Sequence, residues 1–383
     1  MRAIALVPDV PGGGLKLPPS PESGALHPAP SYTLLTVGAK EVLHAWRVSW
    51  ERAGASGCAA SASTWRLRTS LMATRGSLVK PGHAEWTKGC GYVAASVASD
   101  QRYMDVAGFA PVSGGGAVAL AASSEGAVAA MALERSAGKS VTGEASRTNA
   151  FARASPRAST SFRWRTFADL RFHDRPVLAV DVAGARVADG AVAVVAATGA
   201  TDGALAIWDI TRAVEEKGDS RVPTLAPSHV TCGAHQSGVN GVAVRAVAGS
   251  AGRFVVASGG DDQVARAEVF LVERDGDASR RRLRVVSVAR VATHFAHSSA
   301  IKAVWLGPGT RAGTLTLATT SHDQRARVWT VASRVAEDSV TMTPETGAFV
   351  ECPEPEGLDG FVDARGRARI AVSGRGVQMF ELE

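Results

Sequence analysis

The sequence lacks the features that mark several large classes of protein. Its four cysteines, Cys58, Cys90, Cys232 and Cys352, stand far apart and form no CxxC pair, so the sequence indicates neither a disulfide framework nor a zinc site. No apolar run reaches the roughly 18 residues that a membrane span needs. The apolar run at the N-terminus is broken at Pro8 and is too short for a secretory signal. These absences favour a soluble protein of a reducing compartment, and we expect it in the cytoplasm.

The composition is that of a chain with a sizeable core. The sequence has 383 residues, of which 45% are hydrophobic, and a chain of this size buries about 75% of its unfolded surface. Prolines are concentrated between residues 8 and 30, beside a run of three glycines, which is typical of a linker. We therefore divide the chain into a Pro/Gly-rich N-terminal segment, residues 1–30, and a folded part, residues 31–383.

Residues 297–329 have the layout of one propeller blade. His297 precedes two strands of alternating hydrophobicity, and a polar turn at Asp323 leads into a third strand that reaches Trp329, six residues later. A buried carboxylate would hold the amides of such a turn. His297 and Thr319 would relay hydrogen bonds to the indole, a network that is stable when every member has a partner. One copy alone is also compatible with an ordinary β-hairpin.

Two further copies decide between these readings. They contain His235, Ser258 and Asp262 in one case and Thr198, Asp202 and Trp208 in the other. Asp262 lies 27 residues after His235, and Asp323 lies 26 residues after His297. Trp208-Asp209 is the dipeptide for which WD repeats are named, and repetition of one layout is the signature of a repeat architecture. The sequence therefore predicts an all-β protein with a WD40-type β-propeller.

Three weaker units bring the number of recognisable blades to six. Residues 32–48 have Lys40 in place of the turn aspartate, residues 102–133 have Glu125 in the turn and Met131 at the tryptophan position, and the C-terminal segment has a shortened turn. Stretches of small and polar residues at 51–64 and 135–160 are expected to be inserted loops. A seventh blade is not excluded. We expect residues 2–7 to close the ring by completing the last blade.

The sequence contains no recognisable catalytic or metal site. It has no dinucleotide fingerprint, HExxH or GxSxG motif, and its glycine runs lack the context of a phosphate loop. Each His–Ser/Thr–Asp set has the composition of a catalytic triad, but an enzyme needs one nucleophile and not several. His294 and His297 have no third metal ligand at suitable spacing. We expect a non-catalytic protein without a cofactor or metal.

Arginines form two candidate nucleic-acid patches in a chain of net charge +6. One contains Arg280, Arg281, Arg282 and Arg284, and the other contains Arg163 and Arg165 around Trp164, with Arg171 and Arg175. Clustered arginines neutralise phosphates and an adjacent aromatic ring can stack on a base. The alternative is a solvated outer strand whose arginines extend along its surface.

The motifs resemble a known family when they are taken in order. AHQSGVN, ASGGDDQ, AHSSAIK and SHDQRARVW, together with LLTVGAKEVLHAW, QRYMDVAGF and VSGRGVQMFE, are similar to the C-terminal part of WD repeat-containing protein 6 and its fungal counterpart. The resemblance extends over most of residues 31–382. It implies a non-catalytic partner of an FtsJ-type methyltransferase that 2'-O-methylates wobble nucleotide 34 of tRNA. The chain would hold the tRNA as the single scaffold subunit of a heterodimer with that enzyme.

A general interaction scaffold is the alternative, for example a substrate receptor of a cullin ubiquitin ligase. Such receptors often contain Trp-Asp-x-Arg. Here Trp208-Asp209-Ile210-Thr211-Arg212 places the arginine one residue late.

Overall fold

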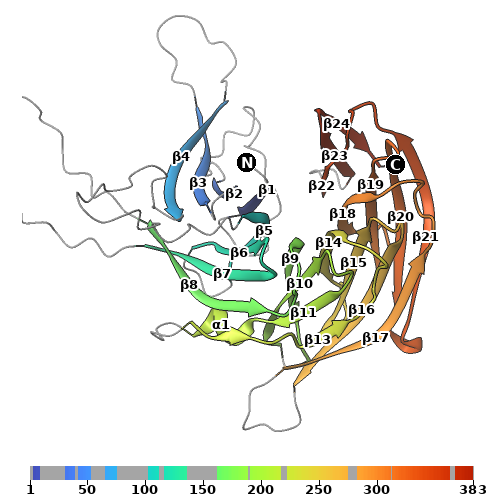
Figure 1. Cartoon of the computed structure of the whole chain (residues 1–383), viewed down its shortest axis with the longest axis horizontal. Helices are drawn as coiled ribbons and strands as arrows, with labels where there is room; N and C mark the ends of the chain where they lie inside the picture. The colour runs from blue at the N-terminus through green and yellow to red at the C-terminus, as the bar shows by residue number, and fades with distance from the viewer. Residues whose placement is uncertain are drawn as a thin grey trace, which may run out of the picture.

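The chain is a six-bladed β-propeller in which the sheets surround a central axis (Figure 1). The computed structural model describes residues 3–8, 31–38, 42–52, 65–75, 102–111, 116–135, 162–188, 190–216, 222–274, 283–311, 313–362 and 367–382. Each blade is a sheet of successive antiparallel strands, with its first strand innermost. The predicted all-β propeller is therefore confirmed.

The first three blades contain the following strands. Blade 1 has β1 (Ala3–Pro8), β2 (Ser31–Val37), β3 (Leu43–Arg52) and β4 (Trp65–Arg75). Blade 2 has β5 (Tyr103–Phe109), β6 (Val118–Ser123), β7 (Ala127–Arg135) and β8 (Phe162–Arg171), and β12 (Thr224–Leu225) pairs with β8 in parallel. Blade 3 has β9 (Val177–Arg186), β10 (Val192–Ala200), β11 (Leu205–Asp209) and β13 (His229–Thr231), with helix α1 (Thr211–Glu215) between the last two.

The last three blades follow the same order. Blade 4 has β14 (Val239–Ala246), β15 (Arg253–Gly260), β16 (Ala265–Arg274) and β17 (Leu283–Thr293). Blade 5 has β18 (Ile301–Pro308), β19 (Thr314–Ser321), β20 (Arg325–Arg334) and β21 (Ser339–Phe349), with a 3-10 turn, Val335–Glu337, before the last strand. Blade 6 has β22 (Gly357–Val362), β23 (Ala368–Gly374) and β24 (Gly376–Glu381).

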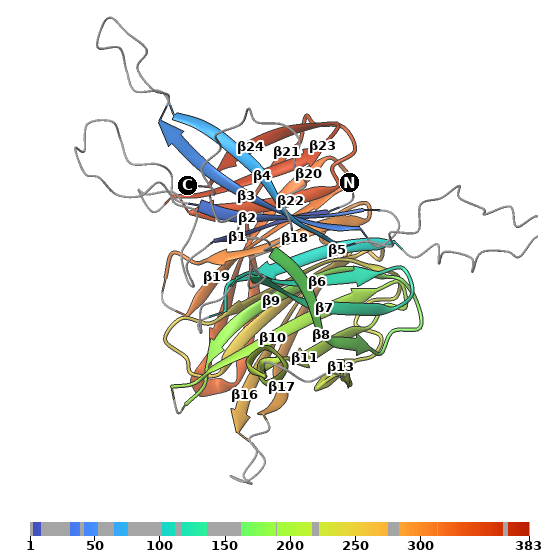
Figure 2. The same ribbon diagram turned by 90° about the vertical axis from the view of Figure 1, so that its left-hand side faces the viewer.

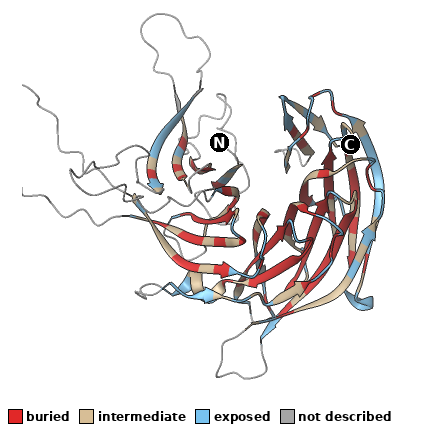
Figure 3. Cartoon of the chain, viewed as in Figure 1, coloured by how far each residue is buried: buried red, intermediate tan, exposed pale blue. Residues whose placement is uncertain are grey.

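Burial along each blade follows from its neighbours. Middle strands are covered on both faces, and every residue of β15 is buried although Arg253 and Ser258 are polar. Outer strands such as β21 are mostly exposed (Figure 3). This explains why the middle strands have continuous small and apolar runs, whereas the outer strands alternate with threonine, arginine and glutamate.

Five hydrophobic clusters join successive blades. They contain Leu35 and Leu133 between blades 1 and 2, Leu120 and Trp208 between 2 and 3, Ile207 and Phe270 between 3 and 4, Val255 and Trp329 between 4 and 5, and Trp305 and Ile370 between 5 and 6. Within the described ranges, no such cluster joins blade 1 to blade 6. These two blades flank an opening in the ring (Figure 1).

The expectation that residues 2–7 complete the last blade is wrong. β1 pairs with β2 in unbroken register, from Ala3 opposite Val37 to Pro8 opposite Tyr32. Val7 is buried in the cluster between blades 1 and 2, so β1 is held as the innermost strand of blade 1 by its pairing with β2 and by this apolar contact.

The stretches expected as inserted loops, 51–64 and 135–160, begin inside strands, because Glu51 and Arg52 belong to β3 and Arg135 belongs to β7. The rest of each stretch, residues 53–64 and 136–160, lies outside the described residues. Nothing tests the division at residue 30, which stays a prediction, although Ala3–Pro8 belongs to blade 1. In the described part of the chain, no helix has the length and hydropathy to span a membrane.

Candidate functional site

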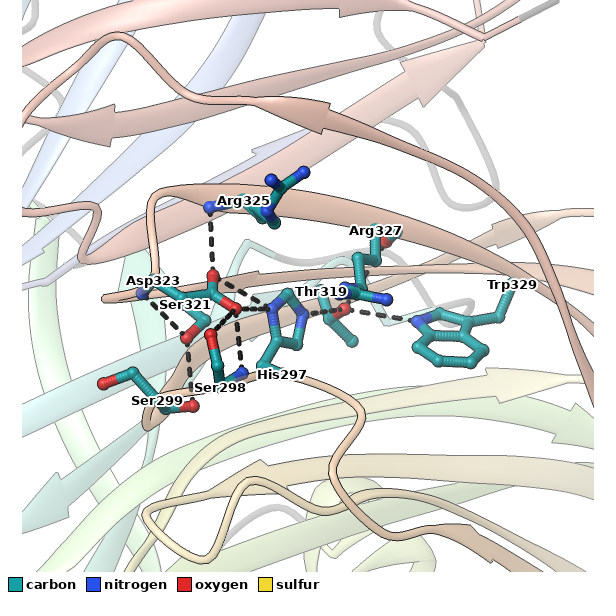
Figure 4. A network of polar contacts seen from close by, with 9 residues as sticks. All are labelled: His297, Ser298, Ser299, Thr319, Ser321, Asp323, Arg325, Arg327 and Trp329. Atoms are coloured by element: carbon teal, nitrogen blue, oxygen red, sulfur yellow. Dashed lines mark hydrogen bonds and ion pairs between the residues drawn. The ribbon is translucent and has the colours of Figure 1, made fainter.

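The structure brings His297, Thr319, Asp323 and Trp329 together in blade 5 (Figure 4). The Nδ1 atom of His297 lies 3.0 Å from Asp323 Oδ2, and its Nε2 atom lies 2.8 Å from Thr319 Oγ1. A carboxylate only accepts, so Nδ1 donates its hydrogen and Nε2 accepts from the Thr319 hydroxyl. Trp329 Nε1 donates to the same Oγ1 at 3.2 Å.

Asp323 also holds the surrounding turns. Its carboxylate accepts from the backbone amides of Ser298 and Arg325, both at 3.0 Å. One side chain therefore ties the loop before β18 to the turn between β19 and β20. This is the role that a tight turn requires of its aspartate.

Blade 4 contains the second set with one replacement. His235 Nδ1 lies 2.9 Å from Asp262 Oδ1, and His235 Nε2 lies 2.8 Å from Ser258 Oγ. Glu268 occupies the position six residues after Asp262, where blade 5 has tryptophan. This buried carboxylate accepts from Ser287 Oγ at 2.6 Å, from Thr231 Oγ1 at 3.2 Å and from Arg266 Nη2 at 3.0 Å.

Blade 3 contains a histidine that the sequence motifs did not reveal. His173 Nδ1 lies 2.9 Å from Asp202 Oδ2 and its Nε2 lies 2.9 Å from Thr198 Oγ1, to which Trp208 Nε1 donates at 3.0 Å. His173 precedes Asp202 by 29 residues. This spacing is close to those of the other two sets and could have identified it.

Blade 1 retains one link of the network. Trp46 Nε1 donates to Thr36 Oγ1 at 3.2 Å, as the tryptophans of blades 3 and 5 do. Lys40 in place of the turn aspartate predicts a blade without this network, but the hydrogen bond between Trp46 and Thr36 is present. Lys40 itself lies outside the described residues.

Burial and charge set the protonation of these groups. Burial lowers the pKa of His297 below its ordinary value although the Asp323 carboxylate opposes this shift. Burial alone would raise the pKa of Asp323, but the Ser298 amide and the His297 ring outweigh it and hold the pKa below its usual range. Burial likewise lowers the pKa of His235 against the opposing Asp262 carboxylate. Burial acts to raise the pKa of Asp262, but the His235 ring and the Gln236 amide outweigh it and lower this pKa. Both pairs are therefore neutral imidazole beside carboxylate near neutral pH.

The sets are not arranged for nucleophilic catalysis. The side chains that would attack a substrate, Thr198, Ser258 and Thr319, are buried, and Thr198 and Thr319 accept from a tryptophan as well. The three sets lie in three different sheets and do not converge on one cavity. Their arrangement supports turns and strands.

The inner strands of the blades line a central cavity of about 1320 Å³. Asp105 and Asp181 on its wall link neighbouring blades, because Asp105 Oδ2 accepts from the Val180 amide at 2.9 Å and Asp181 Oδ2 from the Val244 amide at 2.7 Å. Sequence reasoning did not identify them, although each is an aspartate followed by valine within an apolar inner strand.

Charge in the cavity is mixed. Burial raises the pKa of Asp105, of Asp359 and, to about 7, of Asp181. Arg245 has its pKa lowered by burial, with Asp181 and Asp359 acting against the shift. In the described ranges, no three His, Cys, Asp or Glu side chains are grouped to hold a metal ion.

The described arginines of the two candidate patches lie on two different blades. Arg163 and Arg165 lie on β8 and share Glu134, at 3.4 Å and 2.5 Å, and Arg165 is the main cause of the lowered pKa of Glu134. Arg284 lies on β17, two blades away, 3.6 Å from Glu273. The other members of its patch, Arg280, Arg281 and Arg282, lie outside the described residues.

The aromatic residue of the β8 patch is not free to stack on a base. Trp164 is partly buried against the cluster between blades 1 and 2. Arg171 pairs with Asp169 at 2.6 Å, and Arg175 is exposed in the loop after β8. The three arginines of β8 thus have carboxylate partners within blade 2, with Arg163 and Arg171 exposed, whereas the indole is partly buried against the core.

Comparisons with known proteins give a partial structural match and no sequence match. No family model matches the chain, and no curated protein matches its sequence. The crystal structure of Sqt1 from Saccharomyces cerevisiae matches with a TM-score of 0.40 and 9% identity, over 68% of this chain and 56% of that one. The chain therefore spans little more than half the length of that structure, and at this identity the likeness does not extend to function.

Proposed function

We propose that this chain is a non-catalytic scaffold that binds tRNA and orients it for an FtsJ-type methyltransferase, which methylates the 2'-hydroxyl of wobble nucleotide 34. The identity of the substrate and enzyme comes from the order of motifs that resemble WD repeat-containing protein 6. The scaffold role is supported by the fold.

One observation carries the scaffold role. The three His–Ser/Thr–Asp sets are buried as internal ties of three separate blades, with their hydroxyls closed to any substrate. The residues that have the composition of catalytic triads are thus used to hold the loops between strands. A propeller whose polar residues fix its loops in this way presents a rigid surface, which suits the positioning of a partner.

Charge supports an RNA ligand. The net charge is +6, and exposed arginines lie on β8, the fourth strand of blade 2, and on β17, the outer strand of blade 4. A folded RNA presents its phosphates along an extended backbone, so it can contact two blades at once. Such contacts weaken as salt rises because they release counterions.

The test is reconstitution from purified parts. We expect the chain and the methyltransferase to co-purify, and methylation of nucleotide 34, measured by nucleoside mass spectrometry, to require both. Replacing Arg163 and Arg165 together with glutamate should weaken tRNA binding in an anisotropy titration at low salt, and so should the triple replacement of Arg280, Arg281 and Arg282.

The matched control is Arg334→Glu, which alters an exposed arginine on blade 5 outside both patches. Equal tRNA affinity of all variants and the parent would refute the arginine patches. Methylation of nucleotide 34 by the enzyme alone, at the same rate as with the scaffold, would refute the proposed function.

The cullin-receptor alternative rests on the segment after Trp208. Asp209 accepts from the Thr211 amide at 3.0 Å, and Arg212 is exposed on α1, where it pairs with Glu216 at 2.8 Å. An exposed arginine is available to an adaptor. Recovery of a cullin adaptor without RNA would support this alternative against the tRNA scaffold.

A further inference from the structure

A phenylalanine in the loop before β18 is exposed in an unusual backbone conformation. The Phe295 side chain is 83% exposed, and its backbone has φ 54°, in the left-handed region that residues with a Cβ atom rarely adopt. The matching loop of blade 4 has Gly233 with φ 63°. The fold therefore needs a left-handed residue at this place but no aromatic side chain, and backbone strain of this kind is typical of functional positions.

The ring of Phe295 extends from a rigid segment. Ala296 and His297, which follow it directly, are buried, and the His297 ring is held by Asp323 and Thr319. The backbone next to Phe295 is therefore fixed while the ring itself is in solvent. A side chain held in this way loses little conformational entropy when a ligand binds to it.

The network that fixes this loop also places a cation beside it. The Asp323 carboxylate accepts from the amides of both Ser298 and Arg325, so Arg325 lies beside the loop that contains Phe295. The Arg325 side chain is exposed and points away from the network (Figure 4). In the part of the chain that the structure describes, its guanidinium forms no ion pair, whereas all three arginines of β8 do.

Phe295 and Arg325 lie on the same face of the ring. In the edge-on view of Figure 2 the inner strands run from one face of the ring to the other. The loop before β18 and the turn between β19 and β20 are therefore on one face, which we call the loop face. The turn between β18 and β19 is on the opposite face.

Blades 3 and 4 do not have this pair of side chains. Two residues after the turn aspartate, where blade 5 has Arg325, they have Ala204 and Val264. Two residues before the histidine, where blade 5 has the phenylalanine, they have Arg171 and Gly233. The combination of an exposed ring with an adjacent cation is therefore a feature of blade 5, and the His–Asp network does not require it.

The chemistry of the pair fits a nucleotide better than a protein surface. An unpaired base stacks on an aromatic ring, and a guanidinium binds a phosphate through charge-assisted hydrogen bonds. A protein contact at Phe295 would need surrounding side chains that exclude water. Its exposed neighbours His294 and Ser298 are polar, and in residues 283–308, all of which are described, no other large hydrophobic side chain is exposed.

We propose that Phe295 and Arg325 form a contact for single-stranded RNA on the loop face of blade 5. The ring stacks on an unpaired base, and the guanidinium binds a phosphate of the backbone. For the identity of the RNA this inference rests on the proposed function, since tRNA presents unpaired bases in its loops.

Anisotropy titrations with a labelled single-stranded RNA oligonucleotide test the role of the ring. Phe295→Gly should raise Kd by about 5- to 150-fold, which corresponds to the stacking of one base. The same variant should be more resistant to urea than the parent, because it removes the strain at this position. Phe295→Tyr keeps an aromatic face and should bind as the parent does, whereas Phe295→Leu should bind more weakly. Weaker binding by a more stable protein is not expected if Phe295 has only a structural role.

The salt dependence of the same titration tests the cation. Arg325→Gln should reduce the slope of log Kd against log salt concentration by about 0.7, the contribution of one phosphate on a single strand. Arg311→Gln is the matched control, because it removes the same charge from an exposed arginine in the turn between β18 and β19, on the opposite face of the same blade. Equal slopes for these two variants, or equal affinities for Phe295→Gly and the parent, would overturn the contact.

Failure of the contact and failure of the proposed function give different results. If single-stranded RNA binds through Phe295 but methylation of nucleotide 34 does not need the chain, the contact holds and the methyltransferase assignment is wrong. If methylation needs the chain but Phe295→Gly binds RNA as the parent does, the contact alone is refuted. Loss of methyltransferase co-purification in Phe295→Gly with unchanged RNA affinity would assign the loop face to that enzyme and refute the RNA contact.

Discussion

Replacing Asp323 with alanine should be among the most costly single changes on the surface loops. The substitution removes the acceptor for His297 Nδ1 and for the amides of Ser298 and Arg325. The two amides belong to exposed residues and can bond to water instead. The His297 ring is 1% exposed and cannot, so either tautomer leaves one buried ring nitrogen without a partner.

The magnitude follows from these three losses. A buried polar group without a partner costs about 1 to 3 kcal/mol, and each turn hydrogen bond exchanged for water about 0.5 to 1.5 kcal/mol. The free energy of unfolding should fall by about 2 to 6 kcal/mol in total. Asp323→Asn keeps one acceptor oxygen and should lose less.

Blade 3 provides an internal comparison. The Asp202 side chain is 25% exposed, against 5% for Asp323, so water can replace more of what Asp202→Ala removes, and its cost should be smaller. Urea unfolding followed by tryptophan fluorescence gives both values. A larger loss for Asp202→Ala than for Asp323→Ala, or no loss for either, would show that burial does not determine the energy of these turn aspartates.

Three further predictions concern pH and backbone strain. The pKa of Asp181 is raised in the folded protein from 3.8 to about 7, so ionisation of this carboxyl lowers the stability as the pH rises through that range. Asp181→Asn should therefore raise the free energy of unfolding at about pH 8, by at most roughly 4 kcal/mol, and should have no such effect near pH 4. His235 and His297 have pKa values below the ordinary 6.5, so the unfolded state binds protons first and the urea midpoint should fall as pH drops below 6.5. Phe295 is 83% exposed with φ 54°, where the matching loop of blade 4 has Gly233 with φ 63°. Phe295→Gly should therefore raise the free energy of unfolding by about 0.5 to 1 kcal/mol, whereas Gly233→Phe should lower it.

The propeller could be predicted from the sequence because its signals are local. A turn aspartate and an upstream histidine recur at nearly constant spacing in blades 3, 4 and 5. A tryptophan six residues after the aspartate accompanies them in blades 3 and 5. The spacing would also have found His173. The local sequence does not mark this histidine, because Phe172 precedes it where the histidines of blades 4 and 5 follow an alanine.

Features that depend on packing between distant segments could not be predicted. The position of β1 depends on whether blade 1 or blade 6 has an unpaired strand edge with apolar side chains beside it. The sequence of residues 3–8 suits either blade. Trp164 has the alternation of a half-buried strand, but only the contact between blades 1 and 2 shows which side of β8 is covered. In the sequence, Asp181 is a single polar residue within an apolar strand. Its role is visible only in the structure, where its carboxylate accepts a hydrogen bond from the Val244 amide of the adjacent inner strand.

The uneven distribution of the polar sets separates their role from that of the core. In the described residues, blades 1, 2 and 6 form complete or nearly complete sheets without a His–Asp pair, so apolar packing between sheets is sufficient to build a blade. The pairs occur in blades 3, 4 and 5, which are consecutive and packed on both sides. There the His–Asp pair fixes the loop entering each blade against its hairpin turn. The rigid loops therefore gather in the part of the ring that lies opposite the opening between blades 1 and 6 (Figure 1). A scaffold built in this way can hold a partner on loops of fixed geometry.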